Sequence, residues 1–379
     1  PVLLALRPPR VTYGLIAANV AVFLLESWWG GSEWTPTLYR MGAVAGRATL
    51  GTEPWRIFAS AFLHIGVVHL LANMIVLYGF GHFLEGVLGP WRVLVLYAVS
   101  AAGGGLISTL AHEQRLAAGA SGAVWGLMVA QIVLLLRPRV LFQDLAFNVD
   151  KWPVLQPLVL NLLISLHPAI DFYGHLGGGL AGGLFMASGL LARDPAERGW
   201  RGAALLATAL MAASMAAALA RGRPWELRAP RLEMRTLPGA RIAVPVPRGT
   251  EEVAAAEGLR FGSPRRDPLV IECRHEVFPA ALTAEQRDAE LALLARRMAS
   301  EELGGLVVRE EGPAVVQIGG RPAYHLAVRN ARGARSDLWY FMEGRHGLRL
   351  EVVQAGDVPE RWRSVPSRIA AGVEFQDAR

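Results

Sequence analysis

The sequence predicts a polytopic α-helical membrane protein followed by a soluble α+β domain. The 379 residues are 53% hydrophobic, and residues 1–220 contain only 13 of the 38 Lys and Arg and 10 of the 32 Asp and Glu. Beyond residue 220 the long apolar runs give way to short, strand-like segments. We expect a transmembrane domain over residues 1–220, an irregular Pro- and Arg-rich linker over 221–247, and a soluble α+β domain over 248–379.

Seven apolar runs approach the roughly 20 residues that a helix needs to cross a hydrocarbon core. They cover residues 11–25, 67–84, 93–110, 121–136, 154–170, 173–192 and 203–220. The fifth run is the weakest, because Pro153 and Pro157 interrupt its start. The segment between the first two runs has too little apolar continuity to cross and is expected to be an interfacial loop. About seven spans follow.

The distribution of basic residues predicts the orientation. If the N-terminus is inside, the inner segments carry nine Lys and Arg, whereas the outer loops carry only Arg40, Arg47, Arg56 and Arg115. The positive-inside rule therefore favours a cytoplasmic N-terminus. An odd number of spans then places residues 221–379 on the extracytoplasmic side. We expect an integral protein of a bacterial inner membrane.

The charge balance argues against nucleic acid as a partner. Residues 221–379 hold 25 basic and 22 acidic side chains, and no basic cluster is interleaved with aromatic residues. The single cysteine, Cys273, cannot form an internal disulfide, and in a predicted strand it is expected to be a small buried apolar residue.

Two reactive polar residues lie in charge-free runs. Ser121 stands in a Gly-Ala-Ser-Gly motif at the start of the fourth span, and His175 lies within the sixth. Such groups are costly at membrane depth and usually have a function. The N–H groups and dipole at a helix N-terminus can stabilise an oxyanion, and an imidazole can take the serine proton. Alternatively, Ser121 is only a helix cap or a small packing residue.

A histidine and an asparagine on the second span extend this pair. His69 and Asn73 are four residues apart and therefore share one helix face. The Asn73 amide is a suitable donor to an oxyanion. Side chains from three spans are thus expected to converge on one water-accessible cavity. His64, which precedes them, is expected to buttress the outer loop.

Glycines are concentrated around these polar residues. Gly122 and Gly126 on the fourth span, and Gly178 and Gly182 on the sixth, are each spaced by four residues. Small residues at this spacing let helix backbones approach closely in lipid. We expect the fourth and sixth spans to pack tightly. The alternative is that membrane helices are simply rich in glycine.

A metal site is the remaining chemical alternative. His167, Asp171 and His175 occur at four-residue intervals, which is compatible with ligands on one helix face. Pro168 and Gly174 argue against a continuous helix through all three. We expect no metal and no cofactor.

Taken in order, these motifs resemble the rhomboid family of intramembrane serine proteases. The resemblance runs from about residue 55 to residue 192. It comprises Trp55-Arg56, His64, His69-x-x-x-Asn73, Gly119-x-Ser121-Gly122 and His175-x-x-Gly178-x-x-x-Gly182. It implies a rhomboid fold, with a six-span core and here one extra C-terminal span.

The resemblance also implies roles for particular residues. Ser121 would be the nucleophile and His175 the general base of a Ser–His dyad. Asn73, His69 and the backbone N–H of Ser121 would form the oxyanion hole. Trp125 takes the position where many members have a tyrosine against the catalytic histidine. The supporting glycines are Gly119, Gly122, Gly178 and Gly182. Glu85 would be structural, and Asp171 is expected to be a loop or cap residue rather than a third catalytic member.

The implied reaction is hydrolysis of peptide bonds in or near transmembrane segments of membrane-protein substrates. The alternative is a non-catalytic scaffold of the same fold that binds transmembrane helices. A solute transporter is disfavoured, because the sequence has no matching halves with broken helices.

The soluble domain is predicted from changes in the spacing of apolar residues along the sequence. Strands are expected over residues 269–278 and 322–330, and a hairpin over 338–342 and 348–353. A capping box at Thr283 and Gln286 begins a helix to about residue 303, and another helix covers 359–371. This order loosely resembles Mog1/PsbP-like folds. A role in binding the substrate or another partner is expected. The remaining histidines have no partner at useful sequence spacing.

Overall fold

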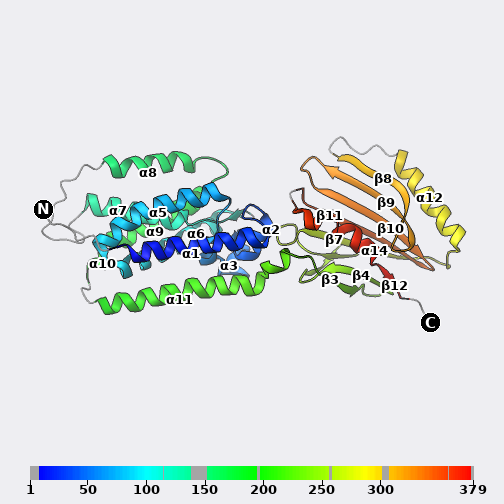
Figure 1. Ribbon diagram of the computed structural model, residues 1–379, viewed down its shortest axis with the longest axis horizontal. Helices are drawn as coiled ribbons and strands as arrows, with labels where there is room; N and C mark the ends of the chain where they lie inside the picture. Colours follow the sequence, from blue (N-terminus) through cyan, green and yellow to red (C-terminus); the bar gives the residue numbers. More distant parts are fainter. Residues whose placement is uncertain are drawn as a thin grey trace. The chain divides into compact units, whose positions relative to one another are not determined.

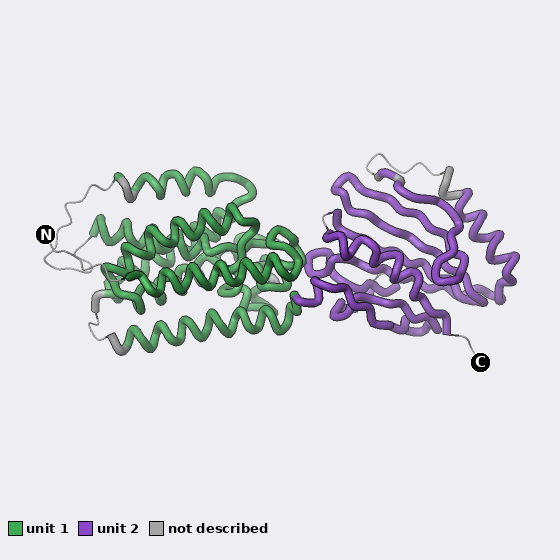
Figure 2. Tube along the Cα trace, viewed as in Figure 1, with its two compact units in different colours: residues 1–224 green, residues 225–379 purple. Residues whose placement is uncertain are grey.

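The computed structural model describes residues 8–113, 115–137, 152–193, 197–255, 258–300, 307–356 and 358–376. The chain divides into two compact units, residues 1–224 and residues 225–379 (Figure 2). The first unit is helical and the second is rich in β-sheet (Figure 1).

The first unit contains a helix over each of the seven predicted apolar runs. These helices are α1 (Arg10–Trp29), α5 (Val67–Leu88), α6 (Pro90–Ala111), α7 (Ser121–Leu136), α8 (Trp152–Ser165), α9 (Phe172–Ala187) and α11 (Glu197–Gly222). By length and composition, α1, α5, α6 and the Gly199–Gly222 part of α11 can cross a membrane, whereas α7 is a shorter apolar helix. The chain is therefore a membrane protein with several apolar helices.

The segment between α1 and α5 is more ordered than an interfacial loop suggests. It forms α2 (Thr35–Met41), β1 (Val44–Ala45), α3 (Ala48–Thr52), α4 (Arg56–Ala59) and the 3-10 helix η1 (Ser60–Phe62). Arg56 organises it: the buried guanidinium donates to Glu53 at 2.7 Å and to the carbonyls of Tyr39 and Ala43 at 2.5 and 2.9 Å. Strand β1 pairs with β2 (Leu116–Ala117), which leads into α7. The loop is thus tied to the start of α7.

A buried carboxylate joins the first two long helices. Glu85, in the last turn of α5, accepts hydrogen bonds from the Val11 and Thr12 backbone amides at 3.0 and 2.9 Å. It also accepts from the Thr12 hydroxyl at 2.8 Å. The free N–H groups and positive dipole of the α1 N-terminus account for a carboxylate at this position. This contact agrees with a structural role for Glu85.

Glycines bring α6, α7 and α9 into backbone contact. A Cβ on Gly178 would overlap the carbonyl oxygen of Gly122, and one on Gly182 would lie 2.5 Å from the Gly126 carbonyl oxygen. A Cβ on Gly104 of α6 would lie 3.2 Å from the Gly122 Cα. The predicted close packing of the fourth span against the sixth is confirmed, and α6 closes the group.

The second unit contains a seven-stranded antiparallel sheet in the order β5-β6-β7-β11-β10-β9-β8. Its strands are β5 (Glu252–Ala255), β6 (Gly258–Phe261), β7 (Leu269–Val277), β8 (Val307–Ile318), β9 (Arg321–Asn330), β10 (Arg335–Glu343) and β11 (His346–Gln354). Helix α12 (Ala284–Ser300) covers one end of the sheet, where Leu291 packs against Tyr324, Leu326 and Met342 (Figure 1). Thr283 and Gln286 form the predicted capping box. Residues 301–303, which the prediction included in this helix, lie outside the described residues.

The predicted strands and hairpin are present, but two other expectations were wrong. The segment 221–247, expected to be irregular, contains β3 (Leu232–Thr236) and β4 (Ile242–Pro247), which form a sheet with β12 (Glu374–Phe375) in the order β12-β4-β3. The prolines of β4 misled the prediction. Pro245 and Pro247 are tolerated because the short β12 pairs only with Ile242 and Ala243.

The helix expected over residues 359–371 is two short helices. They are α13 (Glu360–Arg363) and α14 (Val365–Ala371), with Pro366 at the start of the second. Proline has no backbone N–H to donate to the previous helical turn, but it is tolerated in the first turn of a new helix. The first helix therefore ends before Pro366. The apolar side of the pair is nevertheless buried, since Trp362, Val365 and Ile369 are almost fully enclosed.

Replacement of Gly178 by alanine is expected to separate α7 from α9. Overpacking of a tight contact typically costs about 1–3 kcal/mol, so Gly178→Ala should unfold earlier in detergent-denaturation or thermal scans. Gly202→Ala on α11 is the matched control, because a Cβ there meets nothing within 4 Å. Equal stability of the two variants would contradict the packing described here.

A buried carboxylate on β10 makes the second unit sensitive to acid. Burial raises the pKa of Asp337, but hydrogen bonds from His325 at 3.1 Å and from Arg335 at 2.8 and 2.9 Å outweigh it, so the pKa lies below its usual value. A carboxyl with a depressed folded-state pKa stabilises fully above its unfolded pKa, about 3.9. This stabilisation is lost as the pH falls through the folded-state value.

We expect Asp337→Asn to destabilise the second unit at neutral pH by about 1.5–3 kcal/mol and to remove part of its acid sensitivity. Hydrogen exchange of β9 and β10 peptides in the whole chain, corrected for the intrinsic pH dependence of exchange, measures both effects. Asp288→Asn is the control, since that side chain is 58% exposed. An Asp337→Asn chain with the acid sensitivity of the wild type would refute the assignment.

Candidate functional site

Ser121 is the first residue of α7, and a tight turn delivers it there. Gly119 has a φ of +140° and donates its N–H to the Ser60 carbonyl at 2.9 Å. A Cβ on Gly119 would lie 3.0 Å from His69 Nε2 and 3.5 Å from Ser121 Oγ. The His69 and Ser121 side chains therefore both lie next to the space where a Gly119 side chain would be. Glycine is required there by the backbone conformation and by the approach of His69.

His175 lies in the first turn of α9 and faces α7. Its ring stacks on Trp125, with the centroids 5.4 Å apart and the planes at 20°. Trp125 is one turn after Ser121 and shares its helix face. The stack therefore holds the His175 ring beside the face of α7 that carries Ser121. Trp125 thus makes the stacking contact with His175 that the resemblance implies for an aromatic residue at this position.

One ring nitrogen of His175 makes a contact that the sequence did not predict. His175 Nδ1 lies 2.6 Å from the hydroxyl of Ser165, the last residue of α8. Ser165 also donates to the Asn161 carbonyl at 2.6 Å. Sequence reasoning missed Ser165 because a serine near the end of an apolar helix commonly bonds its own backbone, and nothing local links it to His175.

Asp171 caps α9, and its backbone carbonyl accepts the His175 backbone N–H at 3.1 Å. Its Oδ1 accepts from the Gly174 amide at 3.0 Å and lies 3.4 Å from His112 Nε2. The interpretation of Asp171 as a cap residue is confirmed. His167 lies in the turn between α8 and α9, so the three residues spaced by four do not share one helix face.

His69 of α5 lies beside the turn at Gly119. His69 Nδ1 accepts from the Ile65 amide at 3.3 Å, and its ring meets the His64 ring edge-on at 5.2 Å. Asn73, one turn further along α5, donates to the His69 carbonyl at 2.9 Å and is buried. An amide nitrogen has two N–H groups, so this bond leaves one for another acceptor.

His64 supports the turn that carries Ser121. It is fully buried, its backbone N–H donates to both oxygens of Glu26 at 3.1 and 3.2 Å, and its Nε2 accepts a long hydrogen bond of 3.5 Å from the Ala120 amide. These contacts join α1, the segment between α1 and α5, and the start of α7. They agree with the expected buttressing role.

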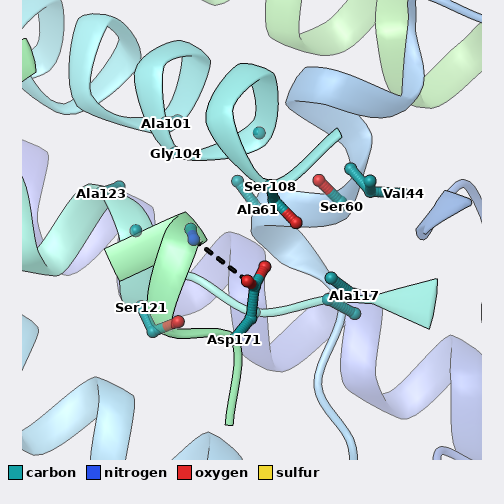
Figure 3. A pocket seen from close by; sticks show the side chains of 15 residues that line it. Val44, Ser60, Ala61, Ala101, Gly104, Ser108, Ala117, Ser121, Ala123 and Asp171 are labelled. Atoms are coloured by element: carbon teal, nitrogen blue, oxygen red, sulfur yellow. Dashed lines mark hydrogen bonds between the residues drawn. The ribbon is translucent and has the colours of Figure 1, made fainter. Parts of the chain in front are cut away.

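A cavity of about 40 Å³ lies next to Ser121 (Figure 3). Its polar lining comes from Ser60, Ser108 and Asp171, and Gly104 and Gly119 form part of its wall. The Ser108 hydroxyl is buried and has no hydrogen-bond partner among the described residues. A space of this size with several polar groups can hold a water molecule. The space therefore has room for water beside Ser121. His69, Asn73 and His175 do not line it, so this cavity is not the one on which all four side chains were expected to converge.

Comparison with known proteins identifies this region. Residues 51–193 match the model of the Rhomboid domain. These residues form a Rhomboid domain. The resemblance to the rhomboid family is therefore confirmed for this part of the chain, which contains Ser121, His175, His69 and Asn73.

Several relatives carry the same name. RHOMBOID-like protein 5 of Arabidopsis thaliana is 37% identical over 42% of this chain and 51% of its own length. Rhomboid protease GluP of Bacillus subtilis is 33% identical over 48% of this chain and 35% of its own. Rhomboid-like protease 3 of Toxoplasma gondii is 32% identical over 38% and 56%. The chain thus spans about half or less of the length of these relatives.

A solved structure that matches part of this chain shows only a weak likeness to it. The solution structure of cyanobacterial PsbP (CyanoP) from Synechocystis covers 38% of this chain and 92% of its own, at 15% identity and a TM-score of 0.29. A TM-score this low does not identify a common fold.

The histidines outside this site have partners that sequence spacing did not reveal. His275 and His346, on neighbouring strands, are 3.0 Å apart between ring nitrogens, and His325 bonds Asp337. Burial raises the pKa of the Cys273 thiol to about 12, which fits its expected role as an apolar core residue.

The stack between Trp125 and His175 can be tested directly. Trp125→Tyr should retain the ring-current shift of the His175 ring protons in NMR spectra, whereas Trp125→Leu should lose it. The aromatic pair is worth about 0.5–1.5 kcal/mol beyond its area, so the leucine variant should also be the less stable of the two. Trp28→Leu, at a ring 59% exposed on α1, is the control. Unchanged His175 shifts in Trp125→Leu would exclude the stack.

Proposed function

We propose that this protein is an intramembrane serine protease that hydrolyses peptide bonds in or near transmembrane segments. The observation that carries the proposal is the joint placement of Ser121, at the N-terminus of α7, and His175, held by Trp125 against the same face of that helix. Their position in a Rhomboid domain with protease relatives supports it.

In the proposed reaction Ser121 Oγ attacks the substrate carbonyl while His175 Nε2 takes its proton. The Ser121 backbone N–H, His69 and Asn73 donate hydrogen bonds to the oxyanion. The α7 N-terminus supports this role, because its backbone N–H groups are free and its dipole favours negative charge.

His175 then protonates the leaving amine, and water resolves the acyl-enzyme with His175 again acting as base. The polar cavity beside Ser121 suits this second step, since hydrolysis needs water in an apolar environment. None of these steps uses a metal or a cofactor.

A substrate helix must open before it can react. Its carbonyls are held in internal hydrogen bonds, and the apolar surroundings provide no other partners. We therefore propose a preference for small residues at the cleaved bond and for helix-breaking residues near it.

The competing function is a scaffold that binds transmembrane helices without cleaving them. It shares the fold, so the dyad distinguishes the two. A scaffold needs no serine paired with a histidine base, as proposed for Ser121 and His175. It also needs no water-sized polar cavity next to Ser121. These features favour the protease.

The membrane domain is proposed to lie in a bacterial inner membrane with its N-terminus in the cytoplasm, on the basis of the asymmetry in basic residues. Residues 225–379 would then be extracytoplasmic. We propose that this unit binds the substrate or another partner near the membrane surface.

The protease is tested by reconstituting the whole chain in lipid vesicles with a single-span model substrate. Ser121→Ala and His175→Ala should each lower cleavage by about 10³-fold or more, and Ser121→Ala should abolish labelling by a fluorophosphonate. Ser27→Ala is the control, because that exposed hydroxyl bonds only its own helix, at Phe23. Equal cleavage by all four chains would refute the assignment of Ser121 and His175 as the catalytic dyad.

A further inference from the structure

The contact between Ser165 and His175 determines where the imidazole carries its proton. Ser165 Oγ lies 2.6 Å from the Asn161 carbonyl oxygen and 2.6 Å from His175 Nδ1. A serine hydroxyl has one proton and can also accept. A carbonyl oxygen can only accept. At 2.6 Å, two oxygens need a hydrogen between them, so the Ser165 proton belongs to the Asn161 bond.

The hydroxyl must therefore accept at its other contact. His175 Nδ1 is then the donor and carries a proton. In a neutral imidazole only one ring nitrogen is protonated, so Nε2 has a free lone pair. This is the nitrogen that the proposed reaction needs as a base. With the opposite tautomer, one of the two 2.6 Å contacts would lack a hydrogen.

The described surroundings leave this contact nearly closed to water. Ser165 is 1% exposed and His175 is 9% exposed, so bulk water has little access to the bond. Asp171, the nearest acid in sequence, is occupied by the Gly174 amide and faces His112. Trp125 fixes the plane of the ring from the side of α7.

We propose that Ser165 is a positioning residue that holds His175 in the Nδ1-protonated tautomer, with Nε2 directed to Ser121. Ser165 contacts His175 as the acidic residue of a catalytic triad contacts its histidine, but it carries no charge. The catalytic consequence rests on the proposed function, whereas the tautomer itself does not. Helix α8 thus contributes to the site through its last residue.

The tautomer is measured by NMR of the whole chain in detergent with ¹⁵N-labelled histidine. His175→Asn identifies the His175 signals among those of the nine histidines. Near neutral pH the wild type should show a protonated Nδ1 and an unprotonated Nε2. Ser165→Ala should populate the other tautomer, and Ser165→Thr should restore the wild-type pattern. A wild-type His175 with its proton on Nε2 overturns the proposal without any variant.

The kinetic test uses the same variants with the model substrate. Ser165→Ala should lower kcat roughly tenfold with little change in KM, because the hydroxyl orients the base and does not contact substrate. Ser165→Thr should recover most of this loss. Ser100→Ala is the matched control: Ser100 is buried and bonds the carbonyl four residues earlier, at 2.7 Å, in α6. Ser165→Ala with the kcat and tautomer of Ser100→Ala overturns the proposal.

The two proposals fail in different ways. A wild-type chain that shows the Nδ1 proton but neither cleaves substrate nor labels at Ser121 overturns the protease and leaves the tautomer assignment standing. A chain that cleaves, but in which loss of the Ser165 hydroxyl changes neither tautomer nor kcat, overturns only the role of Ser165.

Discussion

The membrane unit depends on direct backbone contact between α6, α7 and α9. Lipid tails provide no hydrophobic drive for helix association, so close van der Waals contact has to supply it. Gly104, Gly122 and Gly178 supply it by presenting no side chain where the helices meet. The same contact sets the geometry of the site. Ser121 precedes Gly122 and His175 precedes Gly178 by less than one turn, so docking of the glycines brings the N-terminal turns of α7 and α9 together.

Every polar group brought to this depth needs a partner, because water is scarce there. Several of these groups find their partner on another element. Glu85 accepts from the α1 N-terminus, Glu26 accepts from the His64 amide, and Ser165 bonds His175. The Ser108 hydroxyl is buried without a partner among the described residues, and it lines the cavity beside Ser121. A buried hydroxyl in this state is a natural partner for water.

The sequence predicted features that depend on local pattern. The spacing of apolar residues and the identity of near neighbours in sequence are enough to predict several features. These are the apolar runs, the spacing of Gly122 and Gly178, the capping box at Thr283 and the hairpin of β10 and β11. Features set by distant partners were missed. Ser165 meets His175 through a turn between helices, and β4 was hidden by prolines that only a very short partner strand tolerates. Neither feature can be recognised from the residues of a single helix or strand.

The choice of a serine rather than a carboxylate beside His175 follows from its surroundings. An ionised carboxylate at the nearly enclosed end of α8 would carry a large desolvation cost, and His175 is its only evident counterpart. A hydroxyl costs far less and is fully satisfied by Asn161 and His175. It orients the ring but cannot stabilise an imidazolium by charge. In the proposed reaction, stabilisation of the reacting state would then come chiefly from the α7 N-terminus, His69 and Asn73.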